Sequence, residues 1–298
     1  MGIKMPEFSK AFAAEARGGG ATRDRARTTF VSLEKFSRTA KWGQTTPLNM
    51  TSKQVNQYIK GRVAAGISAR VIQNEASHIR RALRGAGRAL GDIRDPKNNF
   101  SNSRCSVPGA SRIGGKAPAD VEKFSQAELP ADVRAALDLA IEFGLRRAES
   151  VKATNVEEWA RSLALAEKNG LGADLHLSAD AGSKGGRPRY IHIQADRVAL
   201  AMKTVQVAIE LKRENGGRLI QADSLQEALK RVSNACTRAG LTGDDSAHGL
   251  RRAWASSQRN GYLAQGLTEK TALARLSVDL GHGDQRGRWV ENNYLKGK

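Results

Sequence analysis

The chain has 298 residues, enough for about two domains, and 49 Lys and Arg against 30 Asp and Glu give it a net charge of +19. Residues 1–116 hold 22 basic and 7 acidic residues and residues 117–298 hold 27 and 23, so most of the excess charge lies in the first part and indicates a polyanionic partner, either nucleic acid or an anionic membrane surface. The sequence contains no apolar run of about 18 residues, CxxC pair, HExxH motif or phosphate-binding glycine loop, so we expect no membrane span, no metal or ATP site, and a protein of the cytoplasm.

Residues 1–95 are predicted to form a helical domain. Apolar residues recur at helical spacing within 22–40 and 52–65, and Thr51 is placed to cap the second of these helices. A longer helix is predicted over 68–90, with apolar residues on one side and five arginines on another: Arg70, Arg80, Arg81, Arg84 and Arg88. A run of charges usually forms a solvated face, but the guanidinium fork matches phosphate oxygens, so we interpret these five as phosphate-contacting residues.

Proline, glycine and asparagine cluster in residues 96–120, which predicts a linker and a domain boundary near residue 115. Residues 121–298 are predicted to form a mostly helical domain with one small sheet. The sheet is a hairpin of two strands, over 175–179 and 190–193. The helices are expected over 131–143, 159–170, 195–213, 224–239, 247–260 and 268–279.

Four separated segments place a basic or proton-transferring group beside glycine or a helix end, and a tyrosine follows them. They are GLRRAE (144–149), SKGGR (183–187), HGLRR (248–252), LGH (280–282) and Tyr294. Each alone is common, since a lone histidine is usually structural and a lysine at a hairpin tip is usually a solvated turn residue. Together they could transfer a phosphodiester: arginines stabilise the charge of a pentavalent phosphorus without a metal, tyrosine can attack it, and lysine can protonate the leaving oxygen.

These motifs resemble those of tyrosine recombinases of the phage-integrase type. Residues 143–150 are similar to that family's first arginine box and 183–191 to its catalytic-lysine hairpin, while the His-x-Leu-Arg and Leu-Gly-His boxes and the nucleophile position follow in order. The resemblance covers about residues 130–298, and the N-terminal part is similar to the core-binding domain only in its helical, basic character. It implies a mainly α fold with a small antiparallel β-sheet: a helical DNA-binding (core-binding) domain in 1–95, a linker in 96–120 and an α+β catalytic domain in 121–298.

The resemblance implies a covalent mechanism that uses neither metal nor ATP nor any other cofactor. Arg146 and Arg251 would clamp the scissile phosphate, and Glu149 would orient Arg146. Tyr294 would attack the phosphorus and form a 3′-phosphotyrosine, from which a 5′-hydroxyl of a partner strand later displaces it.

Three further residues would handle protons and phosphate oxygens. Lys184 would be the general acid for the leaving 5′-oxygen, His248 would assist proton transfer, and His282 would hydrogen-bond the phosphate. The five arginines of the helix predicted over 68–90 would contact the DNA backbone.

The implied function is that of a site-specific recombinase, an integrase of a mobile genetic element. Its expected partners are double-stranded DNA at attachment sites, a homo-tetramer assembled on that DNA, and DNA-bending accessory proteins, in the nucleoid of a prokaryotic cell. Two alternatives stay open: a non-catalytic DNA-binding protein on the same scaffold, and a type IB topoisomerase that nicks and reseals DNA.

The sequence departs from the family pattern near its end. Eleven residues separate His282 from Tyr294, a few more than is common in the family, so we expect a loop insertion around residues 283–287. Tyr262 precedes the Leu-Gly-His box and is expected in the core rather than as a nucleophile. Only four residues follow Tyr294, too few for a useful helix, so any coupling between subunits would have to use another element.

Overall fold

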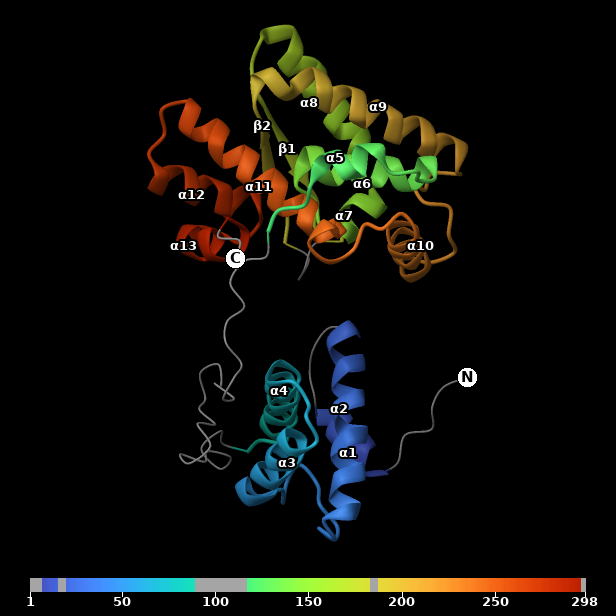
Figure 1. The fold of residues 1–298 in the computed structure, drawn as a ribbon, viewed down its shortest axis with the longest axis vertical. Coiled ribbons are helices and arrows are strands. Elements are labelled where there is room, and N and C mark those ends of the chain that lie inside the picture. The colour runs from blue at the N-terminus through green and yellow to red at the C-terminus, as the bar shows by residue number, and fades with distance from the viewer. Residues whose placement is uncertain (1–6, 16–19, 89–116, 183–186, 296–298) are drawn as a thin grey trace. The chain divides into compact units, whose positions relative to one another are not determined.

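The protein is described from a computed structural model that covers residues 7–15, 20–88, 117–182 and 187–295, without the side chains of residues 7–8, 20–24, 69 and 70. The chain divides into two compact units, Met1–Arg112 and Ile113–Lys298, which we describe separately (Figure 1). Most of the predicted linker falls outside the described residues, so the boundaries at 95 and 120 remain predictions. Within the described ranges, no helix is both long and apolar enough to cross a membrane.

The described part of the first unit is helical. It contains α1 (Glu7–Glu15), α2 (Gly20–Thr39), α3 (Ser52–Ala64) and α4 (Ala69–Gly85). Their apolar faces meet in one core, in which Phe12, Phe30 and Tyr58 are fully buried. The predicted cap is confirmed, because the Thr51 hydroxyl accepts from the Gln54 backbone at 3.2 Å and the Gln54 side-chain oxygen accepts from the Thr51 backbone at 2.8 Å.

The helix predicted over 68–90 is too long by one turn. α4 ends at Gly85, where the following Ala86 and Gly87 leave the helical conformation and Gly87 takes a φ of +77°. Arg88 therefore lies beyond the helix, and its side chain donates to the backbone carbonyl of Met50 instead of extending the arginine row.

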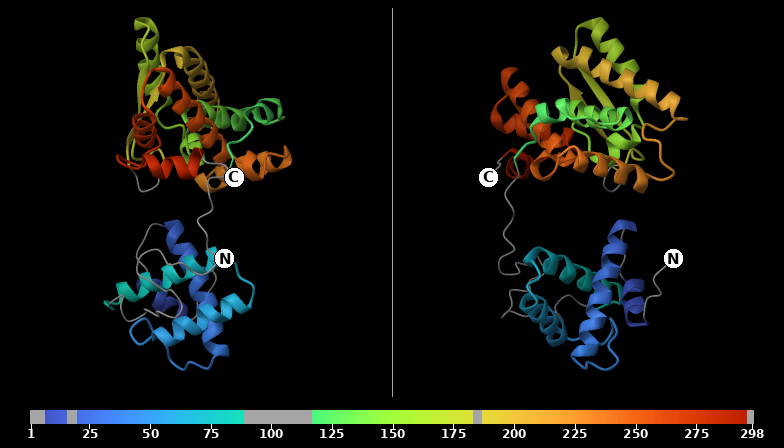
Figure 2. Two further views of the ribbon diagram at one scale, coloured as in Figure 1. Left: turned by 60° about the vertical axis from the view of Figure 1, so that its left-hand side comes forward. Right: turned by 45° about the vertical axis from the view of Figure 1, so that its right-hand side comes forward.

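The second unit combines many helices with one small sheet, as predicted. The elements are α5 (Val121–Gln126), α6 (Ala131–Phe143), α7 (Arg147–Lys152), α8 (Val156–Asn169), β1 (Ala173–Leu177), β2 (Arg189–Ile193), α9 (Val198–Glu214), α10 (Leu225–Arg238), α11 (Ala247–Ala264), α12 (Glu269–Asp279) and α13 (Gly287–Val290), followed by a π-helical turn, Glu291–Leu295. Two short 3-10 turns, Ala195–Arg197 and Gly243–Asp245, precede α9 and α11. β1 packs against α8 and β2 against α12, so the hairpin lies between two groups of helices (Figures 1 and 2).

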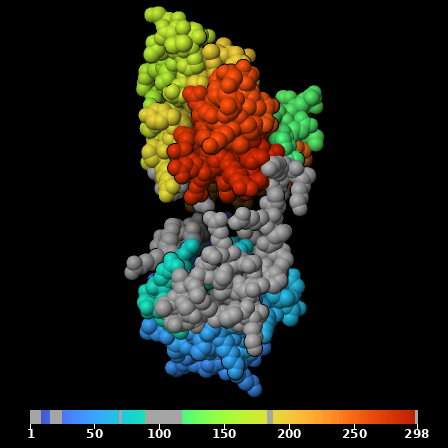
Figure 3. Space-filling model, turned by 90° about the vertical axis from the view of Figure 1, so that its left-hand side faces the viewer, coloured from blue at the N-terminus to red at the C-terminus, as the bar shows by residue number. Residues whose placement is uncertain are grey.

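The two strands pair antiparallel, with Ala173 opposite Ile193 and Leu177 opposite Arg189. Every second residue of each strand is buried. β1 begins and ends two residues before the predicted strand, because the backbone and hydroxyl of Ser178 both donate to the Asn155 side chain and turn the chain away. The C-terminal helices, orange and red in Figure 3, form much of one face of this unit.

Candidate active site

The first arginine box lies where α6 turns into α7. Gly144 takes a left-handed conformation (φ +58°) that ends α6 and leads to Arg146, the residue that caps α7. A Cβ atom at Gly144 would lie 2.3 Å from Cε3 of Trp254, so both the backbone and the packing require glycine. The turn leaves 24% of the Arg146 side chain exposed to solvent.

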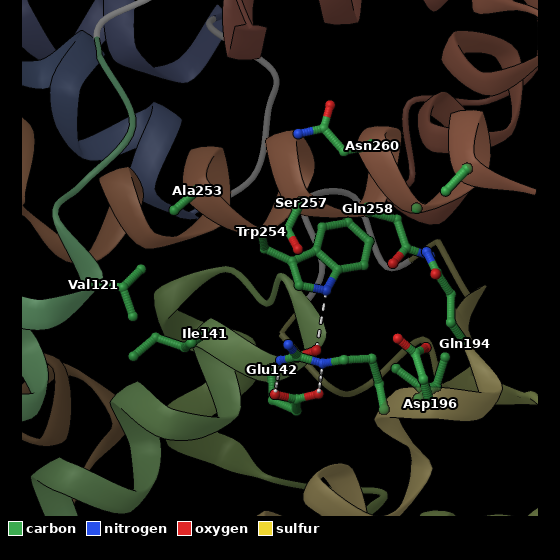
Figure 4. A pocket seen from close by; sticks show the side chains of 14 residues that line it. Val121, Ile141, Glu142, Gln194, Asp196, Ala253, Trp254, Ser257, Gln258 and Asn260 are labelled. Atoms are coloured by element: carbon green, nitrogen blue, oxygen red, sulfur yellow. Dashed lines mark hydrogen bonds and ion pairs between the residues drawn. The ribbon is translucent and has the colours of Figure 1, made fainter.

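Trp254 supports this turn from the wall of a pocket of 450 Å³ between α6 and α11. Its indole nitrogen donates to the backbone carbonyl of Glu142 at 3.0 Å, and the Glu142 carboxylate is bound by Arg197 (Figure 4). None of the predicted site residues lines this pocket.

Glu149 is buried beside Arg146 and accepts hydrogen bonds from two arginines. Its Oε2 accepts from the Arg146 backbone and its Oε1 from Arg146 Nη1, both at 2.7 Å. Arg189 donates Nη1 to Oε1 at 2.8 Å and Nη2 to Oε2 at 2.7 Å. Burial alone would raise the pKa of Glu149, but the hydrogen bonds and charge of Arg189, together with Arg251 and the Arg146 backbone, lower it to about 2. Glu149 is therefore ionised at neutral pH.

The second arginine comes from α11. Arg251 is fully buried, and its Nη1 and Nη2 donate to the backbone carbonyls of Gly144 and Leu280. Arg146 Nη2 donates to the same Leu280 carbonyl at 3.2 Å, so this one oxygen holds the two guanidinium groups side by side. Burial lowers the pKa of Arg251 to about 10, which leaves it charged at neutral pH.

The Leu-Gly-His box forms the turn after α12. Gly281 has a φ of +66°, and the His282 backbone donates to the Ser277 carbonyl at 2.9 Å. The Ser277 hydroxyl donates to the carbonyl of Gly283 at 2.7 Å, which fixes the turn from the other side. The His282 ring packs on Trp289, with 4.4 Å between ring centres.

Tyr294 lies in the π-helical turn and points its hydroxyl at these groups. Its oxygen is 3.3 Å from Arg251 Nε and 3.1 Å from His282 Nε2, and its ring covers the Arg251 guanidinium at 5.8 Å. α13 spans part of the longer segment between His282 and Tyr294, so the extra residues do not keep the two apart. Tyr262, by contrast, is fully buried and donates to Asp279, as expected for a core residue.

Both histidines of the site are weak bases. The His248 ring lies 6.1 Å from the Tyr294 ring and remains partly exposed. Burial and the charges of nearby arginines lower the pKa of His248 to about 4 and that of His282 to about 3. At neutral pH each imidazole is therefore uncharged and can both donate and accept one hydrogen bond.

Two of the predicted site residues cannot be placed. Lys184 and the side chain of Arg70 lie outside the described residues. Of the other arginines proposed to contact phosphate, Arg84 is exposed and Arg80 and Arg81 are half-buried on α4. In the described ranges, no group of three or more His, Cys, Asp or Glu residues is arranged to hold a metal ion.

The sequence analysis missed Arg189. It is the first residue of β2, with 4% of its side chain exposed, and its Nε donates to the Asp279 carbonyl at 2.9 Å. A signal was present in the sequence, because Arg189 is in phase with the buried Ile191 and Ile193 and so occupies an inward position of the strand.

Comparisons with known proteins agree with this architecture. A family model described as "Integrase" matches residues 106–257, and one described as "Phage integrase, N-terminal" matches residues 11–90. No curated protein gave a match.

Solved structures show the same fold. The Tn1549 transposon integrase, solved with transposon right-end DNA, has 13% identity and a TM-score of 0.52 and covers 98% of this chain and 95% of its own. A lambda integrase dimer on a COC′ core site has 18% identity and a TM-score of 0.54, covering 98% and 77%. A lambda integrase tetramer on a Holliday junction has 19% identity and a TM-score of 0.53, covering 93% and 77%.

Because the integrase model alone matches about half of the residues, the chain belongs to the phage integrase family of tyrosine recombinases.

Proposed function

We propose that this recombinase cuts and rejoins DNA at specific sites through a covalent 3′-phosphotyrosine on Tyr294. The observation that carries the proposal is the position of the Tyr294 hydroxyl, 3.3 Å from Arg251 Nε and 3.1 Å from His282 Nε2. Arg146 shares the Leu280 carbonyl with Arg251, and part of its side chain is exposed to solvent. A phosphate placed here would meet a nucleophile and two cations together.

The reaction then follows from these groups. Tyr294 gives up its hydroxyl proton with the help of His248, and its Oη forms a bond to phosphorus. The bond to the 5′-oxygen breaks, and the departing oxygen takes a proton from Lys184. Arg146 and Arg251 stabilise the charge that accumulates on the non-bridging oxygens, where preorganised donors are most effective. Glu149 orients Arg146, His282 donates to a phosphate oxygen and His248 assists the transfer of protons.

One rearrangement is required before the first step. Arg251 is fully buried under the Tyr294 ring, so the Tyr294 hydroxyl must give up its contact with Arg251 Nε for a phosphate oxygen to take its place. The π-helical turn that carries Tyr294 is a short irregular element, and such turns are common at functional sites.

The first unit supplies the grip on the DNA backbone in this proposal. Arg70, Arg80, Arg81, Arg84 and Arg88 would contact phosphates, within a helical domain of residues 1–95 that a linker over 96–120 joins to a catalytic domain of 121–298. Complete recombination cleaves four strands, so we propose a homo-tetramer on attachment-site DNA, with DNA-bending proteins as accessories. Its place would be the nucleoid of a prokaryotic cell.

The test uses the full-length chain and a nicked duplex taken from the DNA that flanks its gene. The nick lets the cleaved end diffuse away, so the covalent adduct accumulates and appears as a shifted band on a denaturing gel. We expect an adduct with the wild type and none with Tyr294→Phe, which loses the nucleophile but keeps DNA binding.

Other outcomes would replace the proposal. An adduct that persists in Tyr294→Phe contradicts the assignment of the nucleophile. DNA binding without any wild-type adduct favours a non-catalytic DNA-binding protein. Relaxation of any supercoiled plasmid, without a specific site, favours a type IB topoisomerase.

A further inference from the structure

Arg189 is an interior arginine to which the proposed mechanism gives no task. It begins β2, five residues after Lys184 in the sequence, and is 4% exposed. A charged side chain is buried at a cost of several kcal/mol unless its hydrogen bonds are well made. The hydrogen-bond partners of Arg189 therefore indicate its role.

Those partners lie in three segments of the site. Nη1 and Nη2 bind both oxygens of Glu149 in α7, at 2.8 and 2.7 Å. Nε binds the Asp279 carbonyl at the end of α12, at 2.9 Å. The side chain also passes under the turn that holds His282, since a Cβ atom at Gly281 would lie only 2.7 Å from Arg189 Cδ.

The fork on Glu149 has a direct consequence for Arg146. Each Glu149 oxygen accepts one bond from Arg189 and one from Arg146, so the carboxylate is held from both sides and cannot rotate. Without Arg189, Glu149 would be buried with two unmet acceptor positions and Arg146 as its one hydrogen-bonded arginine, and the carboxylate could turn toward Arg146. The Arg146 guanidinium would then leave its place beside the Leu280 carbonyl.

We propose that Arg189 is a positioning residue for DNA cleavage: through Glu149 it holds the Arg146 guanidinium in its phosphate-binding orientation, and through Asp279 it ties the strand after Lys184 to the turn of His282. The inference rests on the proposed function. It predicts that the loss of Arg189 slows cleavage without weakening the binding of DNA, because the buried Arg189 side chain binds Glu149 and Asp279 rather than DNA.

The experiment measures the rate of adduct formation in a single turnover, with the full-length chain on the nicked duplex. Arg189→Met and Arg189→Lys are compared with the wild type at a temperature well below the melting temperature of each variant. We expect Arg189→Met to cleave about 100-fold more slowly, the order of loss that a misplacement of about 1 Å causes, with a Kd for DNA within about threefold of the wild type. Arg189→Lys keeps the charge but lacks the fork, so it should remain at least about tenfold slow.

A second buried carboxylate provides the matched control. Arg197 binds Glu142 with Nε and Nη2, at 3.2 and 2.5 Å, outside the site residues. Arg197→Met also strips a buried glutamate of an arginine, and it should lower the melting temperature while it leaves the cleavage rate unchanged. A cleavage defect in Arg197→Met equal to that in Arg189→Met would overturn the proposal.

A modified substrate separates positioning from general damage to the fold. A methylphosphonate at the scissile position lacks one negatively charged oxygen, so a correctly placed Arg146 contributes less to its cleavage. The defect of Arg189→Met should shrink at least about tenfold on this substrate, because the lost stabilisation acts on that charge. An equal defect on both substrates, or a wild-type rate on the ordinary one, would refute the role of Arg189 but leave the wild-type adduct, and hence the proposed function, intact.

Discussion

Replacement of Glu149 by glutamine tests how much the arginine network stabilises the second unit. Glutamine keeps the shape of glutamate, but its NH₂ group would face N–H donors of Arg146 or Arg189 and its charge is lost. The pKa of Glu149 falls from 4.5 to about 2 in the folded chain. That difference corresponds to about 3 kcal/mol of stability at neutral pH, and breaking a buried ion pair from one side costs a similar amount.

The pH dependence gives this prediction its sign. Because the folded pKa lies below the unfolded one, the stabilisation is complete above pH 4.5 and is lost as the pH falls toward 2. The difference in unfolding free energy between the wild type and Glu149→Gln should therefore fall from about 3 kcal/mol at pH 7 to about 1 kcal/mol at pH 3. Other groups titrate equally in both proteins and cancel from this difference.

Urea unfolding of the full-length chain, followed by tryptophan fluorescence, measures these differences. The signal reports mainly on the second unit, which contains Trp159, Trp254 and Trp289. At pH 7 the melting temperature should also fall by about 6–12 °C. Glu157→Gln is the control, because Glu157 pairs with Lys212 at 2.8 Å but is 50% exposed and should contribute less than about 1 kcal/mol. A Glu149→Gln loss below about 1 kcal/mol at pH 7, or one that is the same at both pH values, would refute the reasoning.

Two further predictions concern the arginine box and the DNA-binding helix. Gly144→Ala should cost more stability than Gly170→Ala in thermal melts. Both positions are left-handed (φ +58° and +64°), which costs about 1–2 kcal/mol in each variant. Only at Gly144 would the new Cβ also clash with a neighbour, Trp254. Arg84→Gln should weaken DNA binding and reduce the slope of log K against log salt by about 1, and an unchanged slope would show that Arg84 contacts no phosphate.

The sequence was sufficient to predict most of the longer elements and to propose the site residues, for different physical reasons. In helices such as α6 and α11, apolar residues recur at helical spacing over several turns and pack in the core. The limits of these helices therefore agree with prediction to within a few residues. Arg146, Arg251, His282 and Tyr294 were proposed as site residues from the order of their motifs. Their convergence could not be computed from spacing, because it depends on how α7, α11 and α12 pack.

The features that escaped prediction have either no side-chain signal in the sequence or an ambiguous one. The Leu280 carbonyl joins Arg146 to Arg251, yet a backbone oxygen is the same in every residue. The end of α4 depends on the local conformation of Gly87, which outweighed a helical pattern that continues beyond it. In the sequence, Arg189 was only a charged residue at an inward position of a strand. Because arginine is rarely buried, such a residue usually argues against the strand and does not by itself indicate a site.

The net charge of the arginines around Glu149 says more about the reaction than the net charge of the whole chain does. Arg146, Arg189 and Arg251 surround the single carboxylate of Glu149. His248 and His282 are neutral, because burial, together with nearby arginines that include Arg146 and Arg251, lowers their pKa values. Among the described residues of the candidate site, two net positive charges therefore remain. A phosphodiester brings one negative charge and acquires about one more as phosphorus becomes pentavalent, so the balance is best at the transition state rather than in the bound substrate. Two of the 19 net positive charges that first indicated a polyanionic partner thus lie where one phosphate would react.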